Sequence, residues 1–204
     1  MTITYQVKDA VYVNLTNRCP CNCTFCLRQN GPGVFGSGPL WLEREPTLEE
    51  TMESLGQWDF NRFREVVFCG YGEPTERLDV LLAVAARLKE RDSALRVRVN
   101  TNGLSDLIHG KPTAPLFVGK VDCLSISLNT DDPAEYLTLC RPRFGEAAYP
   151  AMLNCAKEAA ALLPSVVMTV GGEPVTSLEK QERCRAIAEG LGARLRVRPC
   201  EQKV

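Results

Sequence analysis

Four cysteines lie close together near the start of the chain, in the segment "TNRCPCNCTFCLR" at residues 16–28. Three of them, Cys19, Cys23 and Cys26, are spaced C-x3-C-x2-C, and Phe25 directly precedes the last one. Short loops with this many thiols can hold an iron–sulfur cluster, because cysteine thiolates bind the cluster irons. Three ligands on a four-iron cluster leave one iron open, and an open coordination position is typical of a catalytic metal site.

Cys21 is the fourth cysteine of the segment and lies two residues from both Cys19 and Cys23. We therefore expect its side chain to face away from the other three. The alternative use of the segment is a structural zinc site, but such sites usually pair two short cysteine clusters separated by a dozen or more residues. No second close pair follows, and the other six of the ten cysteines are scattered. The spacing predicts no second cluster, and disulfides are disfavoured because the chain is neither short nor visibly secreted.

The composition is that of an ordinary soluble globular protein. The chain has 204 residues, 45% of them hydrophobic and 24% charged, which predicts a single core domain over residues 1–204. The net charge of -1 gives no general attraction to nucleic acid or to an anionic membrane. The N-terminal stretch lacks a signal-peptide pattern, and the apolar runs are too short or too polar to span a bilayer. We therefore expect a cytoplasmic protein.

Apolar segments rich in β-branched residues alternate with helical patterns along the chain. They predict six strands, at 10–16, 64–70, 95–101, 122–129, 165–171 and 193–199. Helices are predicted at 47–58, 76–92, 149–163 and 177–192. The first helix opens with Thr47 and Glu50 in the spacing of a capping box. Alternation of this kind indicates βα units and a parallel sheet, as either an open doubly wound sheet or an incomplete barrel, since a closed eight-stranded barrel takes about 250 residues.

In either architecture, ligands bind at the carboxyl ends of the strands. Polar segments stand at those ends, among them "GYGEP" at 70–74, "NTNG" at 100–103 and "GGEP" at 171–174. A long Gly/Pro-rich segment at 29–46 follows the cysteines directly. Loops of this length are usually functional covers or partly disordered. We predict that this segment orders over the mouth of the site when cofactor or substrate binds.

The segment "NLTNRCPCNCTFCLR", at the end of the first predicted strand, resembles the radical S-adenosylmethionine (radical SAM) superfamily, whose hallmark is C-x3-C-x-aromatic-C. The resemblance covers essentially the whole chain. It implies a partial (β/α)6 TIM barrel of parallel strands with the cluster loop after strand one. It also implies a [4Fe-4S] cluster on Cys19, Cys23 and Cys26, with S-adenosyl-L-methionine chelated to the open iron. One electron would then cleave the sulfonium and yield a 5'-deoxyadenosyl radical that abstracts hydrogen from a substrate.

The resemblance extends to cofactor-binding residues at the strand ends. The family's G-G-E-P segment, which binds the methionine amino group, corresponds to "GYGEP" here, with Tyr71 in place of a glycine. A carboxylate and exposed carbonyls are suitable acceptors for an ammonium group. "NTNG" resembles the tip that faces the ribose and carboxylate, and "SISLN" ends in a polar pair that strand alternation would align. The implied cofactor-binding residues are Phe25, Gly70, Tyr71, Gly72, Glu73, Pro74, Asn100, Thr101, Asn102, Ser127 and Asn129.

Two phrases, "TNRCPCNCTFCLR" and "SISLNTDDPAEYLTLCRPR", look like the small TatD-associated radical SAM proteins. This resemblance implies a functional link to a TatD-type metal-dependent hydrolase and an external one-electron donor of the flavodoxin or ferredoxin type. Alternatives within the superfamily are a 7-carboxy-7-deazaguanine-synthase-like ring rearrangement and the activation of a glycyl radical. The alternative of another class is a non-catalytic iron–sulfur or zinc-binding interaction module.

Three further features have competing interpretations. The "GGEP" at 171–174 matches the family motif better by spelling, but it follows the fifth predicted strand, so we expect Glu73 rather than Glu173 to serve the cofactor. "LRVRVN" and "RLRVRP" place arginines on one face of the third and sixth strands. These arginines either bind an anionic substrate or, as the simpler account, face helix carboxylates. His109, the only histidine, is expected in a solvated loop.

Overall fold

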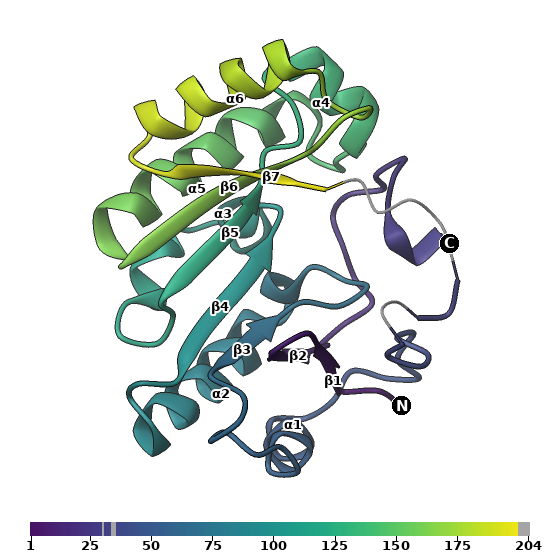
Figure 1. Ribbon diagram of the computed structural model, residues 1–204, viewed down its shortest axis with the longest axis vertical. Coiled ribbons are helices and arrows are strands. Elements are labelled where there is room, and N and C mark those ends of the chain that lie inside the picture. The colour runs from purple at the N-terminus through teal and green to yellow at the C-terminus, as the bar shows by residue number, and fades with distance from the viewer. Residues whose placement is uncertain (30, 34–35, 200–204) are drawn as a thin grey trace.

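A computed structural model describes residues 1–29, 31–33 and 36–199 (Figure 1). Its strands form one sheet in the order β1-β2-β3-β4-β5-β6-β7. They are β1 (Thr4–Val7), β2 (Ala10–Val13), β3 (Glu65–Phe68), β4 (Arg96–Thr101), β5 (Cys123–Ser127), β6 (Ser165–Gly171) and β7 (Arg194–Arg198). Each neighbouring pair from β2 to β7 is parallel. The predicted parallel sheet of six strands is therefore confirmed.

The N-terminal strand, β1, was not predicted. It pairs with β2 in antiparallel register, from Thr4 opposite Val13 to Val7 opposite Ala10. Lys8 adopts a left-handed backbone with φ of 52° in the tight turn between the two strands. A strand of only four residues, "TYQV", is too short to show a clear alternation of apolar and polar side chains.

Four of the α-helices match the predicted ones, and two others were not predicted. They are α1 (Leu48–Leu55), α2 (Leu78–Arg91), α3 (Ser105–His109), α4 (Pro133–Cys140), α5 (Ala148–Leu162) and α6 (Leu178–Gly190). The predicted capping box of α1 is present, because Thr47 and Glu50 exchange side-chain to backbone hydrogen bonds. The unpredicted helices are α3 and α4, and α4 begins at Pro133 after Asp132, whose carboxylate accepts from the backbone N–H of Glu135.

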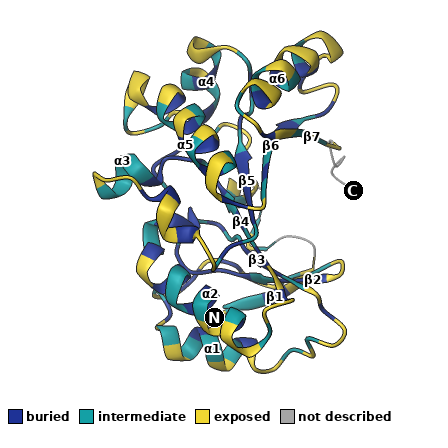
Figure 2. Ribbon diagram, turned by 90° about the vertical axis from the view of Figure 1, so that its left-hand side faces the viewer, coloured by how far each residue is buried: buried dark blue, intermediate teal, exposed yellow. Residues whose placement is uncertain are grey.

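The helices pack on one face of the sheet. The other face carries no helix, and the loops at the strand ends border it (Figures 1 and 2). Alternate strand residues such as Val97 and Val99 of β4 are fully buried in the core that the sheet forms with the helices. The residues between them, including Arg98 and Asn100, therefore project from the helix-free face. No helix in the described part of the chain is long and apolar enough to cross a membrane.

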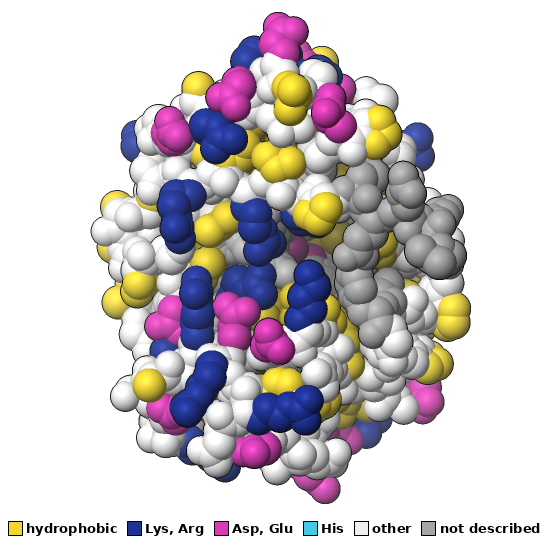
Figure 3. Space-filling model, viewed as in Figure 1, with side chains coloured by type: hydrophobic (Ala, Val, Ile, Leu, Met, Phe, Trp, Pro, Cys, Tyr) yellow, Lys and Arg dark blue, Asp and Glu magenta, His cyan; other side chains and the backbone are white. Residues whose placement is uncertain are grey.

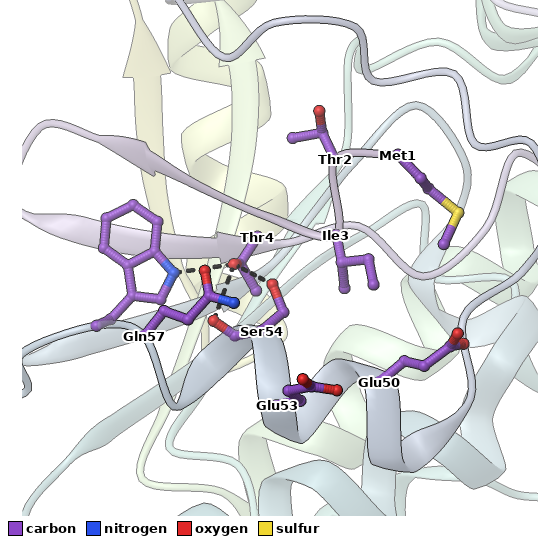
Figure 4. Close-up of a pocket in the computed structure, with 9 residues that line it drawn as sticks. Met1, Thr2, Ile3, Thr4, Glu50, Glu53, Ser54 and Gln57 are labelled. Atoms are coloured by element: carbon purple, nitrogen blue, oxygen red, sulfur yellow. Dashed lines mark hydrogen bonds between the residues drawn. The ribbon is translucent and has the colours of Figure 1, made fainter.

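A pocket of about 490 Å³ lies between β1 and α1 (Figure 4). Thr4 links β1 to the α1 side of the pocket. The Thr4 hydroxyl accepts from the indole N–H of Trp58 at 2.9 Å and lies 2.6 Å from the hydroxyl of Ser54. None of the cysteines or strand-end residues that the sequence singles out lines this pocket. We therefore locate the candidate site elsewhere, at the carboxyl ends of β2 to β5.

Candidate cluster and cofactor site

The loop after β2 that carries the four cysteines, residues 16–28, is here called the thiol loop. Backbone hydrogen bonds to the end of α4 hold it in place. The N–H of Thr24 donates to the carbonyl of Leu139 at 2.9 Å, and the N–H of Asn22 donates to the carbonyl of Cys140 at 3.0 Å. An isolated antiparallel bridge pairs Cys21 with Pro142, two residues after the end of α4. The thiol loop thus has a defined shape that long-range contacts impose, although it contains little regular structure.

The four cysteines of the loop differ in exposure and acidity. Cys19, Cys23 and Cys26 are partly exposed, whereas Cys21 is buried. The expectation that Cys21 faces away from the other three is wrong, because its side chain is hydrogen-bonded with those of Cys19 and Cys23. A hydrogen bond with Cys21 is the main cause that lowers the pKa of Cys19, and hydrogen bonds with Cys140 and then Cys21 lower the pKa of Cys23 to about 4. Burial raises the pKa of Cys26. Two of the three predicted ligands therefore favour the thiolate, which is the form that binds iron.

The donor set fits a cluster better than a single ion. Within the described residues, no three His, Cys, Asp or Glu side chains are grouped so that they could hold one metal ion. A zinc ion needs all its sulfur ligands about 2.3 Å from one centre, whereas cluster thiolates surround a body of several irons. Three partly exposed thiols on one preshaped loop match the second requirement. Phe25, which directly precedes the last thiol in the sequence, is 43% exposed.

The glycines of "GYGEP" allow the chain after β3 to pass very close to the thiol loop. A Cβ on Gly72 would lie 2.3 Å from the carbonyl oxygen of Thr16 and 2.6 Å from that of Arg18. A Cβ on Gly70 would lie 2.0 Å from the side-chain oxygen of Asn14. Real side chains cannot occupy such positions, so this close approach requires glycine. The motif predicted to bind the cofactor therefore lies against the loop predicted to bind the cluster.

Glu73 is the buried centre of this region, with 4% of its surface exposed. Its Oε1 accepts from the hydroxyl of Thr101 at 2.7 Å and from the N–H and hydroxyl of Thr75, while its Oε2 accepts from the N–H of Asn102 at 2.8 Å. Burial raises the pKa of Glu73. Pro74 opens the short 3-10 helix Pro74–Arg77 that Glu73 caps. Glu73 thus ties the end of β3 to the end of β4.

The "NTNG" segment after β4 reaches the thiol loop. The side-chain amide of Asn102 lies 3.8 Å from the sulfur of Cys21. Asn100 projects from the helix-free face, where its side-chain oxygen accepts from Arg98 at 3.3 Å. The prediction of a solvated loop for His109 is wrong: it ends α3, and its Nε2 lies 2.8 Å from the carbonyl oxygen of Thr75. The histidine therefore supports the segment that holds Glu73.

Ser127 and Asn129 do not form an aligned pair. β5 ends at Ser127, and Asn129 has a left-handed backbone with φ of 66°, so strand alternation does not carry over to it. The amide of Asn129 instead donates to the sulfur of Cys140 at 3.2 Å. Cys140 was one of the six scattered cysteines, yet α4 brings it beside Cys23. No spacing in the sequence signals this contact, because it depends on how α4 packs against the loop.

Tyr71, which stands where the family has a glycine, contacts the segment predicted to cover the site. Its hydroxyl donates to the carbonyl of Gly31 at 2.7 Å, and its ring packs edge-on against Trp41 with centroids 5.2 Å apart. The amide of Asn14 donates to the carbonyl of Leu40 at 2.7 Å. Residues 30, 34 and 35 of the segment at 29–46 lie outside the described residues, so ordering of the whole segment on ligand binding stays a prediction.

The second motif, at 171–174, lies elsewhere on the sheet. It begins at the last residue of β6, and β3, β4 and β5 separate this strand from β2 in the strand order. Glu173 is exposed, and the N–H of Gly172 donates to the carbonyl of Arg198 on β7 at 2.7 Å. The strand order assumed when Glu73 was preferred over Glu173 is therefore confirmed.

The arginines of β4 and β7 do not face helix carboxylates, so the simpler prediction for them is wrong. The residues between them, Val97 and Val197 among them, pack on the core, and the arginines project from the opposite, helix-free face. Figure 3 looks onto this face and shows Lys and Arg side chains gathered across its middle, with a smaller number of Asp and Glu side chains. Arg98 pairs there with Glu65 of the neighbouring strand at 2.9 Å.

Comparison with known sequences identifies relatives. Residues 13–187 match the family model of the Radical SAM superfamily. The GTP 3',8-cyclase of Limosilactobacillus fermentum is 29% identical over 136 residues, which is 67% of this chain and 38% of the cyclase. The GTP 3',8-cyclase of Mycobacterium ulcerans is 32% identical over 135 residues, which is 63% of this chain and 33% of the cyclase. The matched part thus spans about a third of the length of these relatives.

Solved structures share the fold. Streptococcus suis SuiB bound to S-adenosylmethionine has a TM-score of 0.62 at 17% identity, covering 92% of this chain and 38% of SuiB. Methylornithine synthase (PylB) has a TM-score of 0.62 at 15% identity, covering 93% of this chain and 52% of the synthase. The sheet is thus the partial TIM barrel that the sequence predicted, in a superfamily that uses a [4Fe-4S] cluster and S-adenosylmethionine. Because the family model matches most of its length, this chain belongs to the Radical SAM superfamily of enzymes.

Proposed function

We propose that Cys19, Cys23 and Cys26 hold a [4Fe-4S] cluster with which the protein reductively cleaves S-adenosylmethionine, giving a 5'-deoxyadenosyl radical that abstracts hydrogen from a substrate. The observation that carries the proposal is the contact between two motifs. Gly72 lies so close to the carbonyls of Thr16 and Arg18 that the "GYGEP" segment directly adjoins the thiol loop.

Each neighbouring group has a part in binding the cofactor. Cys21 and Cys140 stabilise the thiolates of their neighbours through hydrogen bonds. The Oε2 of Glu73 accepts one hydrogen bond, from Asn102, and so keeps a lone pair for the methionine ammonium group. Thr101 fixes the orientation of the carboxylate through its bond to Oε1. Asn100, Ser127 and Asn129 complete the polar lining proposed for the ribose and carboxylate.

Tyr71 and Trp41 serve to keep water away from the cluster that the thiol loop would hold. Their edge-on contact, together with the bond from Tyr71 to Gly31, joins the segment after the thiol loop to the cofactor motif. Excluding water protects a reactive intermediate from side reactions. A glycine at position 71 would offer neither contact.

The wider context is also part of the proposal. Members of this superfamily generally need an external electron donor, here of the flavodoxin or ferredoxin type. We propose a cytoplasmic location, where free thiols persist, a single core domain over 1–204, and a functional link to a TatD-type hydrolase that rests on the sequence resemblance alone. The similarity to GTP 3',8-cyclases favours a nucleotide-like substrate.

The test is the anaerobically purified protein supplied with dithionite and S-adenosylmethionine. We expect a brown protein that produces 5'-deoxyadenosine, measured by liquid chromatography with mass detection. The matched control is the triple variant of Cys19, Cys23 and Cys26 to Ala, which should be colourless and inactive. A colourless wild-type protein that contains one zinc would instead identify a binding module without turnover.

A further inference from the structure

The last strand of the sheet places positive charge at its carboxyl edge. Arg194, Arg196 and Arg198 alternate along β7 with Leu195 and Val197, which pack on the core, so the three arginines share the helix-free face. In the strand register, Arg196 lies beside Thr169 of β6, and Thr169 lies beside Ser127 of β5. Arg198 lies beside Gly171, one step nearer the edge.

Within the described part of the chain, the two arginines at this edge have no ion-pair partner. Arg96 and Arg98 of β4 share the carboxylate of Glu65, at 3.4 Å and 2.9 Å. In contrast, the guanidinium groups of Arg196 and Arg198 have no ion-pair partner among the residues that the structure describes. Their Cα atoms are about 6.6 Å apart along the strand. Two like charges at this spacing repel each other, and an anion placed between them would remove that repulsion.

Arg198 also shares the helix-free face of the sheet with Arg98 and Asn100 of β4. Burial is the main cause that lowers the pKa of Arg198, followed by repulsion from Arg196, while the thiol of Cys69 acts in the opposite direction. Cys69 follows β3, four strands away from β7. Neighbouring strands are about 4.8 Å apart, so a flat sheet would separate the two residues by about 19 Å. The sheet is a partial TIM barrel, however, and the curl of such a sheet shortens this separation on its inner, helix-free face.

We propose that Arg196 and Arg198 are the anion-binding subsite of the substrate site and bind a phosphate or carboxylate group of the substrate. The inference rests on the proposed function, because the substrate must then lie between β7 and the cofactor at β2 to β5. The planar guanidinium group remains charged even when it is partly desolvated, and it binds two oxyanion oxygens at once. The subsite would hold the substrate at the edge opposite the cluster, which leaves its other end free to meet the radical.

The test measures anion binding to the reconstituted holoenzyme by isothermal titration calorimetry at low ionic strength. The probes are inorganic pyrophosphate, for a phosphate group, and citrate, for carboxylates. The test variant is the double substitution Arg196→Gln and Arg198→Gln. The matched control is Arg194→Gln, which removes the same charge from the same face of the same strand but farther from the edge. Iron content and melting temperature establish that each variant is folded.

We expect the wild type to bind at least one probe and the double variant to bind it about tenfold or more weakly, as is usual when hydrogen bonds to a charged group are lost. Arg194→Gln should change the affinity less than about twofold. Binding of neither probe, an equal loss in the control, or a double variant that loses S-adenosylmethionine but keeps the anion would overturn the subsite. A wild type that binds the anion through these arginines but makes no 5'-deoxyadenosine would uphold the subsite and contradict the proposed function.

Discussion

The segments at 70–74 and 171–174 have nearly the same letters but different surroundings. Glu73 is buried and accepts four hydrogen bonds, whereas Glu173 is exposed. Gly72 lies against the thiol loop, whereas Gly172 lies against Arg198 of β7. The difference follows from topology, because β3 is the neighbour of β2 and β6 is not. The burial and the neighbours of a motif therefore depend on its position in the sheet, and its sequence alone does not predict them.

The largest expected effect tests the thiol loop that only the first motif adjoins. Replacing Cys19, Cys23 or Cys26 by Ala should abolish the cluster, since each of these thiolates is proposed to hold one iron, whereas Cys21→Ala should retain it. Iron and sulfide per chain are measured in all four variants, with Cys184→Ala on the distant α6 as the control. Loss of the cluster in Cys21→Ala together with its retention in one of the other three would show that a different triad binds iron.

The glycines provide the next comparison. Gly72→Ala places a Cβ 2.3 Å from a backbone carbonyl, so the thiol loop must move, and we expect a loss of about 1–3 kcal/mol in unfolding free energy together with loss of iron. The matched variant is Gly172→Ala, whose Cβ would lie 3.1 Å from the carbonyl of Arg198 and needs only a small shift. Urea unfolding and iron analysis measure both. Equal effects in the two variants would mean that the first motif has no special contact with the loop.

The third comparison is between the two glutamates and concerns the affinity for S-adenosylmethionine. Glu73→Ala should weaken S-adenosylmethionine binding by about 1.5–3 kcal/mol, the usual range for a hydrogen bond to a charged group. Glu173→Ala should leave the affinity unchanged. Anaerobic equilibrium dialysis measures the affinity, and urea unfolding separates it from the stability lost when Thr101 and Asn102 lose their acceptor. If Glu173→Ala were the variant that loses binding, the strand order would be contradicted.

The smallest effect concerns acidity within the thiol loop of the cluster-free, reduced protein. The pKa of Cys23 is lowered to about 4, and that of Cys26 is raised. At pH 6.5, Cys23 is therefore a thiolate and Cys26 a thiol. We expect iodoacetamide to alkylate Cys23 about tenfold faster, because the larger thiolate fraction outweighs its lower intrinsic nucleophilicity. Peptide mass spectrometry follows both rates, and the ratio should shrink by pH 9. In Cys140→Ala the preference should weaken; an unchanged ratio there would show that Cys140 does not stabilise the thiolate.

Much of the sheet was predictable, because apolar runs and strand-end polar segments repeat with the period of βα units. The cluster loop and the nearness of "GYGEP" to it followed from the family resemblance and the strand order. The four-residue strand β1 was missed because it is too short to show a pattern. Helix α4 was missed even though Asp132 and Pro133 are ordinary helix-start residues.

The errors at the site concern contacts between distant segments. Alternation showed that the arginines of β7 share a face but not which face. The packing of the partly buried Val197 against the core settles it. The contact between Cys140 and Cys23 and the support of Thr75 by His109 depend on how helices pack, for which the sequence carries no local signal. The hydrogen bonds of Glu73 come from the neighbouring strand and were hidden for the same reason.

The most direct test of the account is the electron paramagnetic resonance spectrum of the dithionite-reduced protein before and after S-adenosylmethionine is added. The account predicts a [4Fe-4S] signal that shifts when the cofactor binds to the open iron, a much weaker shift in Glu73→Ala and a normal shift in Glu173→Ala. Absence of an iron–sulfur signal, or a signal that S-adenosylmethionine leaves unchanged in the wild type, would contradict it.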